Sequence, residues 1–271
     1  MFINAAAIVR EAEVFVIAAG AGMGVDSGLP DFRGDQGFWK AYTSYARLGL
    51  SFADCANPHH FASDPSFGWG FYGHRTNLYR DTVPHEGFRI IMEWIERKGA
   101  DYFVVTSNVD GQFQKAGYAE DRILEVHGSI HWLQCQAPCS STIWHNEETV
   151  RIDEATMRAR HPLPRCPDCG EISRPNILMF GDRSWLPDRT CIQESAFERF
   201  LAAHADRRIA VIEMGAGSAI PTIRATSERI GWNAEHATVI RINPREPEIQ
   251  APHISMPCGA LEGLRKIDVL L

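Results

Sequence analysis

Residues 19–34 have the sequence AGAGMGVDSGLPDFRG and directly follow the apolar run VFVIA at residues 14–18. Such an apolar run is typical of a buried strand. A glycine-rich turn after a strand can approach a diphosphate closely, because glycine lacks the Cβ that would block it and bare backbone N–H groups can donate to phosphate oxygens. We therefore predict that Gly20, Ala21 and Gly22 form a phosphate-binding turn.

This turn departs from the common dinucleotide pattern G-x-G-x-x-G. Val25 stands where the third glycine would be, and no acidic residue follows on a second strand about 20 residues later. The turn continues instead into Pro30, Asp31, Phe32 and Arg33, which combine a rigid turn with an acid, an aromatic ring and a fixed cation. Phosphate binding beside such a cluster indicates a cofactor that is consumed in the reaction.

The composition limits the class of protein. The 271 residues suit one large domain or a domain with a smaller insertion, and the hydrophobic share of 45% is ordinary for a globular protein. A formal net charge of −7 argues against a nucleic-acid partner and favours a peptide or a small molecule. No apolar run reaches the roughly 18 residues of a membrane span, and the N-terminal ten residues lack the features of a signal peptide. We expect no membrane partner and a cytoplasmic location.

Apolar runs alternate with amphipathic segments along the chain. Patterns typical of strands cover 14–18, 102–106, 123–126, 209–214, 238–242 and 267–270, and helical patterns cover 87–98, 190–205 and 221–230. This alternation predicts an α/β fold with a doubly wound, Rossmann-like parallel sheet. We assign residues 1–34, 86–130 and 181–271 to that domain. A helical insertion at 35–85 and a zinc-binding module at 131–180 are expected to form a smaller domain.

Four of the seven cysteines form two pairs at metal-ligand spacing. Cys135 and Cys139 are separated by three residues, and Cys166 and Cys169 by two. Two such turns can present four thiolates to one zinc ion, and a site with four protein ligands is structural because no position stays open. The alternative is coincidental pairs of buried thiols or disulfides. Metal-ligand spacing favours a reducing compartment.

Polar residues follow four of the predicted strands. The sequence TSNVD covers 106–110, His127 follows 123–126, MGAGS covers 214–218, and Asn243 follows 238–242. Ligands of open α/β sheets bind outside the carboxyl ends of the strands. Taken alone, TSNVD is also typical of an ordinary Asn/Asp turn, and a lone histidine at a strand end is more often structural than catalytic.

Together with Phe180-Gly181-Asp182, these segments resemble, in order, the motifs of the sirtuins, the NAD-dependent protein deacylases. The resemblance implies that NAD is bound by the glycine-rich turns and the strand ends. The implied NAD-binding residues are Gly20, Ala21, Gly22, Asp31, Phe32, Arg33, Ser107, Asn108, Asp110, Gly215, Ala216, Gly217 and Asn243. It also implies that His127 is the catalytic base and that the cysteines hold structural zinc.

The resemblance further implies the reaction and its partners, which are acyl-lysine proteins or peptides. The acyl oxygen attacks the ribose carbon that carries nicotinamide, and nicotinamide departs. His127 then activates a ribose hydroxyl, which takes the acyl group to give O-acyl-ADP-ribose and free lysine. An unperturbed histidine pKa of roughly 6.5 suits this proton transfer near neutral pH.

One helical segment indicates the acyl group. Tyr72 and Arg75 are three residues apart and therefore share a helix face. The pair resembles the Tyr-x-x-Arg of sirtuins that remove succinyl, malonyl or glutaryl groups, because an arginine can pair a carboxylate bidentately and a tyrosine can add a third bond. The alternative is an arginine whose stem covers apolar surface while its head stays in water.

Three departures from the sirtuin pattern keep other functions open. Gly24 replaces the usual Ser, Ser107 the usual Gln, and Ala216-Gly217 the usual Thr-Ser. Each change removes a hydrogen-bonding group near NAD. The alternatives are a sirtuin-fold ADP-ribosyltransferase, an NAD hydrolase, and a non-catalytic NAD-sensing protein, although a sensor would not need His127.

Overall fold

The computed structural model describes residues 1–31, 49–153 and 155–271. Its large sheet has six parallel strands in the order β11-β10-β9-β1-β2-β3. These strands are β1 (Val14–Ala19), β2 (Asp101–Thr106), β3 (Ile123–Glu125), β9 (Ile209–Met214), β10 (Ala237–Ile242) and β11 (Ile254–Met256). The strand order reverses its direction at β1, so the predicted doubly wound, Rossmann-like sheet is confirmed.

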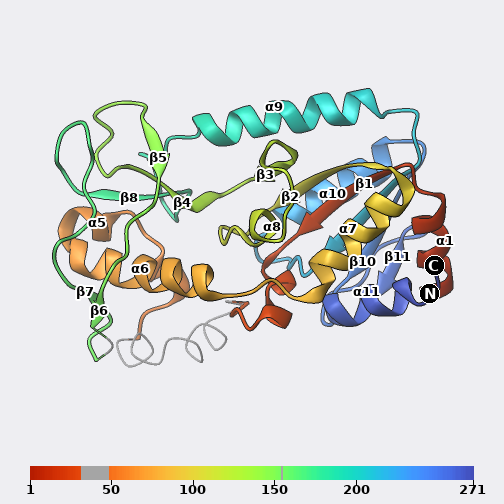
Figure 1. Ribbon diagram of the computed structural model, residues 1–271, viewed down its shortest axis with the longest axis horizontal. Helices are drawn as coiled ribbons and strands as arrows, with labels where there is room; N and C mark the ends of the chain where they lie inside the picture. Colours follow the sequence, from red (N-terminus) through yellow and green to blue (C-terminus); the bar gives the residue numbers. More distant parts are fainter. Residues whose placement is uncertain (32–48, 154) are drawn as a thin grey trace.

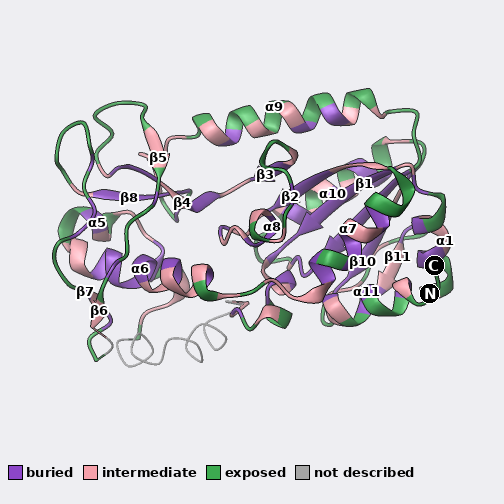
Figure 2. Ribbon diagram, in the orientation of Figure 1, coloured by how far each residue is buried: buried purple, intermediate pink, exposed green. Residues whose placement is uncertain are grey.

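Helices cover both faces of this sheet (Figure 1). On one face, α1 (Phe2–Glu11), α7 (Glu86–Lys98) and α11 (Ala260–Asp268) pack against Phe15 and Ile17 of β1. On the other face, α9 (Asp188–Ala203) and α10 (Thr222–Asn233) pack against Val14 and Val16. Successive side chains of a strand point to opposite faces, so β1 is buried on both sides, as Figure 2 shows for the centre of the sheet.

The strand predicted at 267–270 is wrong, because Ile267 belongs to helix α11. Ala260, Leu264 and Ile267 recur at helical spacing and are all buried against the sheet. A short apolar run at the end of the chain does not by itself separate a helix from a strand. The sixth strand is instead β11, which has only three residues.

A second lobe lies at the end of the molecule far from the two termini (Figure 1). It contains α4 (Phe52–Cys55), α5 (His59–Ser63) and α6 (Pro65–Asp81). Beside them lie the antiparallel sheet of β5 (Ile143–His145), β4 (Gly128–Cys135) and β8 (Ser173–Ile177), and the pair β6 (Ile152–Asp153) and β7 (Arg158–Ala159). One hydrophobic cluster, including Phe61, Trp69, Ile130, Leu133 and Val150, joins the helices to these strands. The helical and the cysteine-bearing segments therefore share a core.

Four short elements follow strands β1 and β2 along the chain. They are η1 (Ala21–Met23), η2 (Val25–Ser27), α8 (Gln112–Lys115) and η3 (Glu120–Arg122). Across the described parts of the chain, no helix is both long and apolar enough to cross a membrane.

Candidate active site

A cavity of about 600 Å³ lies at the carboxyl ends of β1, β2, β3 and β9, between the two lobes. Twelve of the predicted site residues line it: Gly20, Ala21, Asp31, Tyr72, Arg75, Ser107, Asn108, Asp110, His127, Gly215, Ala216 and Gly217. This position, where the strand order of the sheet reverses, is where open α/β sheets bind ligands. The predicted Phe32 and Arg33 lie outside the described residues.

The two glycine-rich turns pack directly against each other. A Cβ on Gly20 would come within 2.7 Å of the Gly215 carbonyl oxygen, and a Cβ on Gly215 within 2.4 Å of the Gly22 backbone. Gly215 also has a φ of +60°, in the left-handed region that favours glycine. Glycine at these positions lets two backbone turns meet above the sheet and leaves a cradle without side chains.

Two N–H groups of the first turn hold this arrangement together. Gly20 donates to Met214 at 2.9 Å, and Gly22 donates to Gly215 at 3.1 Å. These two groups are therefore not the free phosphate donors that the sequence led us to expect. Gly22 lines a smaller neighbouring cavity of about 130 Å³ with Gly215 and Ile242.

Asn243 supports the second turn from behind. Its side chain is fully buried and donates from Nδ2 to the Ala216 carbonyl at 2.8 Å. Its Oδ1 accepts from the backbone N–H groups of Arg245 and Glu246. Asn243 lines neither cavity, so its expected direct contact with a ribose stays a prediction. Its hydrogen bond to Ala216 shows that it supports the second glycine-rich turn.

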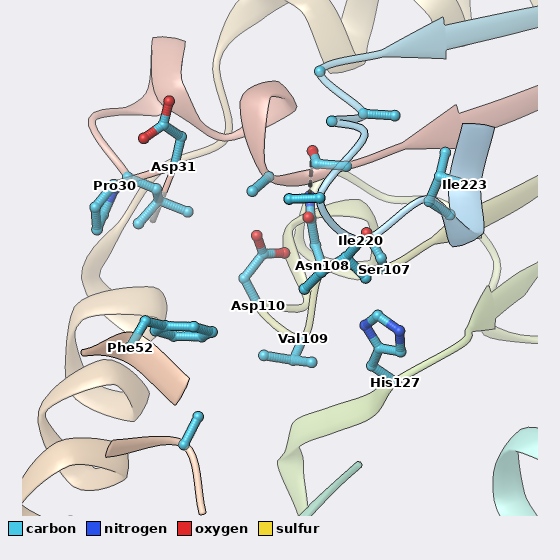
Figure 3. Close-up of a pocket in the computed structure, with 18 of the residues that line it drawn as sticks. Pro30, Asp31, Phe52, Ser107, Asn108, Val109, Asp110, His127, Ile220 and Ile223 are labelled. Carbon is cyan, nitrogen blue, oxygen red and sulfur yellow. Dashed lines mark hydrogen bonds between the residues drawn. The ribbon is translucent and has the colours of Figure 1, made fainter. Parts of the chain in front are cut away.

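The turn after β2 is tied to the turn after β1. Thr106 Oγ1 donates to the Ala19 carbonyl at 3.0 Å and accepts from the Asn108 N–H at 3.0 Å. The Asn108 side chain donates to the Gly20 carbonyl at 3.1 Å (Figure 3). Ser107 donates from its N–H to Ala19 at 3.1 Å. The predicted Asn and Ser are thus fixed to the glycine-rich cradle.

Asp110 lines the cavity together with Phe52 and His127 (Figure 3). Its Oδ1 accepts from the Gln112 N–H at 3.0 Å. Burial raises the pKa of Asp110 to about 6, and the nearby Glu125 adds to this shift, whereas the Gln112 bond and Arg75 oppose it. The carboxyl group is therefore costly to ionise in the folded chain.

His127 is held at the cavity by the buried end of β3. The Arg189 guanidinium pairs with the Glu125 carboxylate at 2.6 Å, and the Gln193 side chain accepts from the Glu125 N–H, so α9 fixes the strand two residues before His127. Burial lowers the pKa of His127, with a partly opposing effect of its hydrogen bond to the Ser107 backbone. A lowered pKa leaves the imidazole neutral near pH 7, the form that accepts a proton.

The predicted pair Tyr72 and Arg75 lines the other end of the cavity, on α6. Arg75 is 5% exposed and lies over the rings of Phe52, Phe71, Tyr72 and Tyr79 at 5.2 to 5.6 Å. Its Nε and Nη2 donate to the Tyr79 hydroxyl at 3.0 and 2.7 Å. The Arg75 head group is thus buried at the cavity rather than in water.

Among the cavity-lining residues that sequence reasoning missed are Tyr79 and Glu246. Tyr79 could have been found, because it lies four residues after Arg75 on the same helix face. Glu246 accepts from the N–H and hydroxyl of Ser218 at 2.7 and 3.0 Å. Ser218 and Glu246 are 28 residues apart in the sequence, so no local pattern indicates this contact.

A buried ion pair fixes the segment that includes Phe180. Arg174 and Asp182 form a bidentate pair at 2.7 and 3.0 Å with fully buried side chains. Phe180 and Met179, just before Asp182, line the cavity. The pair therefore positions the cavity wall that is contributed by β8 and the residues after it.

The four predicted cysteines come together away from the cavity. All four Sγ atoms lie within 4.8 Å of one another, and the pairs Cys135–Cys169 and Cys139–Cys166 are 3.7 Å apart. A tetrahedral zinc site with Zn–S bonds of about 2.3 Å has S···S edges of about 3.8 Å, so the donors fit zinc. A disulfide would need about 2.05 Å. Since none of the four lines the cavity, the site is structural.

Comparisons with known proteins agree with this architecture. The Sir2 family model matches residues 20–199. An NAD-dependent protein deacylase of Thermus thermophilus is 30% identical over 260 residues, which cover 94% of this chain and 89% of the relative. An NAD-dependent protein deacylase of Aeropyrum pernix is 29% identical. The match covers 89% of this chain and 85% of the relative.

Solved structures give the same result. A Sir2 homologue in complex with NAD has a TM-score of 0.71 at 25% identity. The match covers 98% of this chain and 92% of the homologue. A structure of a Sir2 enzyme has a TM-score of 0.69 at 26% identity. The match covers 99% of this chain and 96% of the solved chain. The motifs, the fold and the family match lead to one conclusion: this chain belongs to the Sir2 family, the sirtuins.

Proposed function

We propose that this chain is an NAD-dependent protein-lysine deacylase, which converts acyl-lysine, NAD and water into lysine, nicotinamide and O-acyl-ADP-ribose. The observation that carries the proposal is the convergence of His127, Asn108 and Asp110 on one cavity with the two glycine-rich turns. The names of the Thermus and Aeropyrum relatives support the same activity.

NAD fits the residues of the cavity. Gly20 and Gly215 let the two turns meet without side chains between them, and both line the cavity, so bare backbone faces the space where a diphosphate would bind. Asp31, Ser107, Asn108, Asp110 and the second turn would hold the rest of the molecule. When bound, NAD supplies a ribose carbon with nicotinamide as its leaving group.

The chain's own groups then do three things. The neutral His127 imidazole accepts the proton of a ribose hydroxyl, which its lowered pKa permits at neutral pH. Asn108, fixed to Gly20, orders the ribose side of the cavity. Asp110, beside the same turn, would bind the nicotinamide amide. The apolar wall of Val109, Phe52 and Phe180 excludes water from the reacting carbon.

The second lobe would hold the acyl-lysine substrate. We assign the Rossmann-like domain to residues 1–34, 86–130 and 181–271, and the small domain to 35–85 and 131–180. The peptide lies extended between them, bound by main-chain hydrogen bonds. Tyr72 and Arg75 favour an acyl chain that ends in a carboxylate, such as succinyl, malonyl or glutaryl.

Product analysis tests the proposal. The purified chain is incubated with NAD and matched acetyl-lysine and succinyl-lysine peptides, and the products are identified by mass spectrometry. We expect O-acyl-ADP-ribose. Protein-bound ADP-ribose would instead establish a transferase, free ADP-ribose alone an NAD hydrolase, and the absence of any product a binding protein.

One variant tests the expected preference for acyl groups that end in a carboxylate. Arg75→Met should lower kcat/KM for the succinyl peptide by about tenfold or more, since a bond to a charged group is lost. Arg89→Met is the matched control, because Arg89 is exposed on α7 and pairs only with Glu86 and Glu93 among the described residues. Unchanged desuccinylation by Arg75→Met would contradict the acidic pocket.

A further inference from the structure

Two tyrosine rings lie beside the Arg75 guanidinium at the α6 end of the cavity. Tyr72 and Tyr79 both line this cavity and are only 1% and 4% exposed. The Tyr79 oxygen accepts two hydrogen bonds from Arg75, and a phenol that accepts still has its own proton to donate. Within the described residues, no acceptor receives the proton of either phenol. Two buried donors therefore remain for a ligand.

Both phenols keep their protons at physiological pH. Burial raises the pKa of Tyr72 and of Tyr79, and Arg75 opposes this shift at each ring without cancelling it. The three groups occupy one helix face at positions i, i+3 and i+7. The ring contacts and the two bonds to Tyr79 fix the direction of the guanidinium.

We propose that Tyr79 is a specificity residue of the acyl site, which donates its hydroxyl proton to a terminal carboxylate alongside Tyr72 and Arg75. The inference rests on the proposed deacylase function and adds a third donor to the predicted pair. An ionised carboxylate accepts hydrogen bonds at both oxygens and donates none, so it matches a pocket made of donors. A primary amide of the same shape would place its NH₂ against those donors.

The first experiment needs no variant. Calorimetry measures the binding of wild-type protein to three peptides that differ only at the lysine: succinyl, its terminal amide, and the uncharged isostere 4-methylpentanoyl. We expect the succinyl peptide to bind at least about tenfold tighter than either analogue, since each analogue loses charge-assisted bonds. Equal binding of the succinyl peptide and its amide would overturn the proposal.

The second experiment isolates the Tyr79 hydroxyl. Tyr79→Phe should raise KM for the succinyl peptide by about tenfold with a smaller change in kcat, and should reduce its preference over the 4-methylpentanoyl peptide. Tyr118→Phe is the matched control, because Tyr118 is also buried and its hydroxyl donates to the Phe88 carbonyl, away from the cavity. The control should keep the wild-type preference.

The outcomes separate the two proposals. An unchanged succinyl preference in a folded Tyr79→Phe chain would overturn the role of Tyr79 while deacylation stands. If Tyr79→Phe does not fold, the wild-type binding series decides. If wild-type chain binds the succinyl peptide selectively but forms no O-acyl-ADP-ribose, the donor pocket stands and the deacylase function fails.

Discussion

The side-chain amide of Asn108 donates to the backbone carbonyl of Gly20 at 3.1 Å, across 88 residues of sequence. This bond ties the turn after β2 to the glycine-rich turn after β1. Asn108 lines the cavity as well. The same residue therefore fixes the glycine-rich turn and lines the cavity.

Replacing this side chain should weaken cofactor binding more than it destabilises the fold. Asn108→Ala should lower the free energy of unfolding by about 1 kcal/mol, the usual loss for one hydrogen bond. NAD affinity, measured by calorimetry, should fall by about tenfold. Asn233→Ala, at an exposed position of α10, is the control and should change neither quantity.

Removal of the His127 imidazole should stop acyl transfer and spare the fold. His127→Tyr should lower kcat by about 10²- to 10⁴-fold, because a positioned general base is lost. Zinc content and the melting temperature should stay close to wild type. The exposed His236→Tyr serves as the control. Turnover near the wild-type rate in His127→Tyr would rule out the base role.

The pH profile should report the same imidazole. A base must be neutral, so kcat/KM should fall as the pH drops through the lowered pKa of His127, which places the acid limb below about pH 6.5. Asp110, with a pKa of about 6, titrates nearby. Asp110→Asn removes the titration of the Asp110 carboxyl group. If kcat/KM of this variant still falls at low pH, the fall is assigned to His127.

Asp110→Asn should also stabilise the folded chain. Between about pH 4 and 6 the folded chain keeps the Asp110 proton that the unfolded chain releases, because burial raises the pKa from 3.8 to about 6. The free energy of unfolding therefore falls as the pH rises through this range, by up to about 3 kcal/mol. Denaturant melts at pH 4 and 7.5 should show that Asp110→Asn gains stability chiefly at the higher pH. A gain of the same size at both pH values would contradict the assignment, and the exposed Asp206→Asn should show none.

The buried pair Arg174–Asp182 should dominate the stability of the cavity wall. Asp182→Asn leaves the Arg174 charge buried and unpaired, and should cost about 3 to 5 kcal/mol. Asp153→Asn breaks the partly exposed pair with Arg160, which solvent screens, and should cost far less stability. Chemical denaturation measures both. Equal, small losses would show that the Arg174–Asp182 pair does not support the wall.

Zinc should hold the second lobe together. The metal content should be one zinc per chain, and Cys166→Ser or a strong chelator should remove it and lower the melting temperature. Cys191→Ser, at an exposed cysteine outside the cluster, should retain both the metal and the stability. Full stability without metal would refute a structural zinc site.

The sequence predicted those parts of the fold that depend on neighbouring residues. The run 209–214 is apolar throughout and forms a strand with these bounds, because a central parallel strand is buried on both faces. The spacing of Cys135, Cys139, Cys166 and Cys169 is enough to predict a metal cluster. The strand predicted around Ile267 was wrong, because a short apolar run is compatible with both a helix and a strand.

Contacts between distant segments were decided by the tertiary structure alone. Gly20 and Gly215 meet because β1 and β9 pair in parallel with Ala19 opposite Met214, which no local pattern encodes. The same strand ends place Asn243 behind the second turn instead of in the cavity, and bring Glu246 to Ser218. Side-chain chemistry and short-range spacing are properties of the sequence itself. Which turns share a cavity follows from the strand order, and that order is set by how the buried faces of the whole chain pack together.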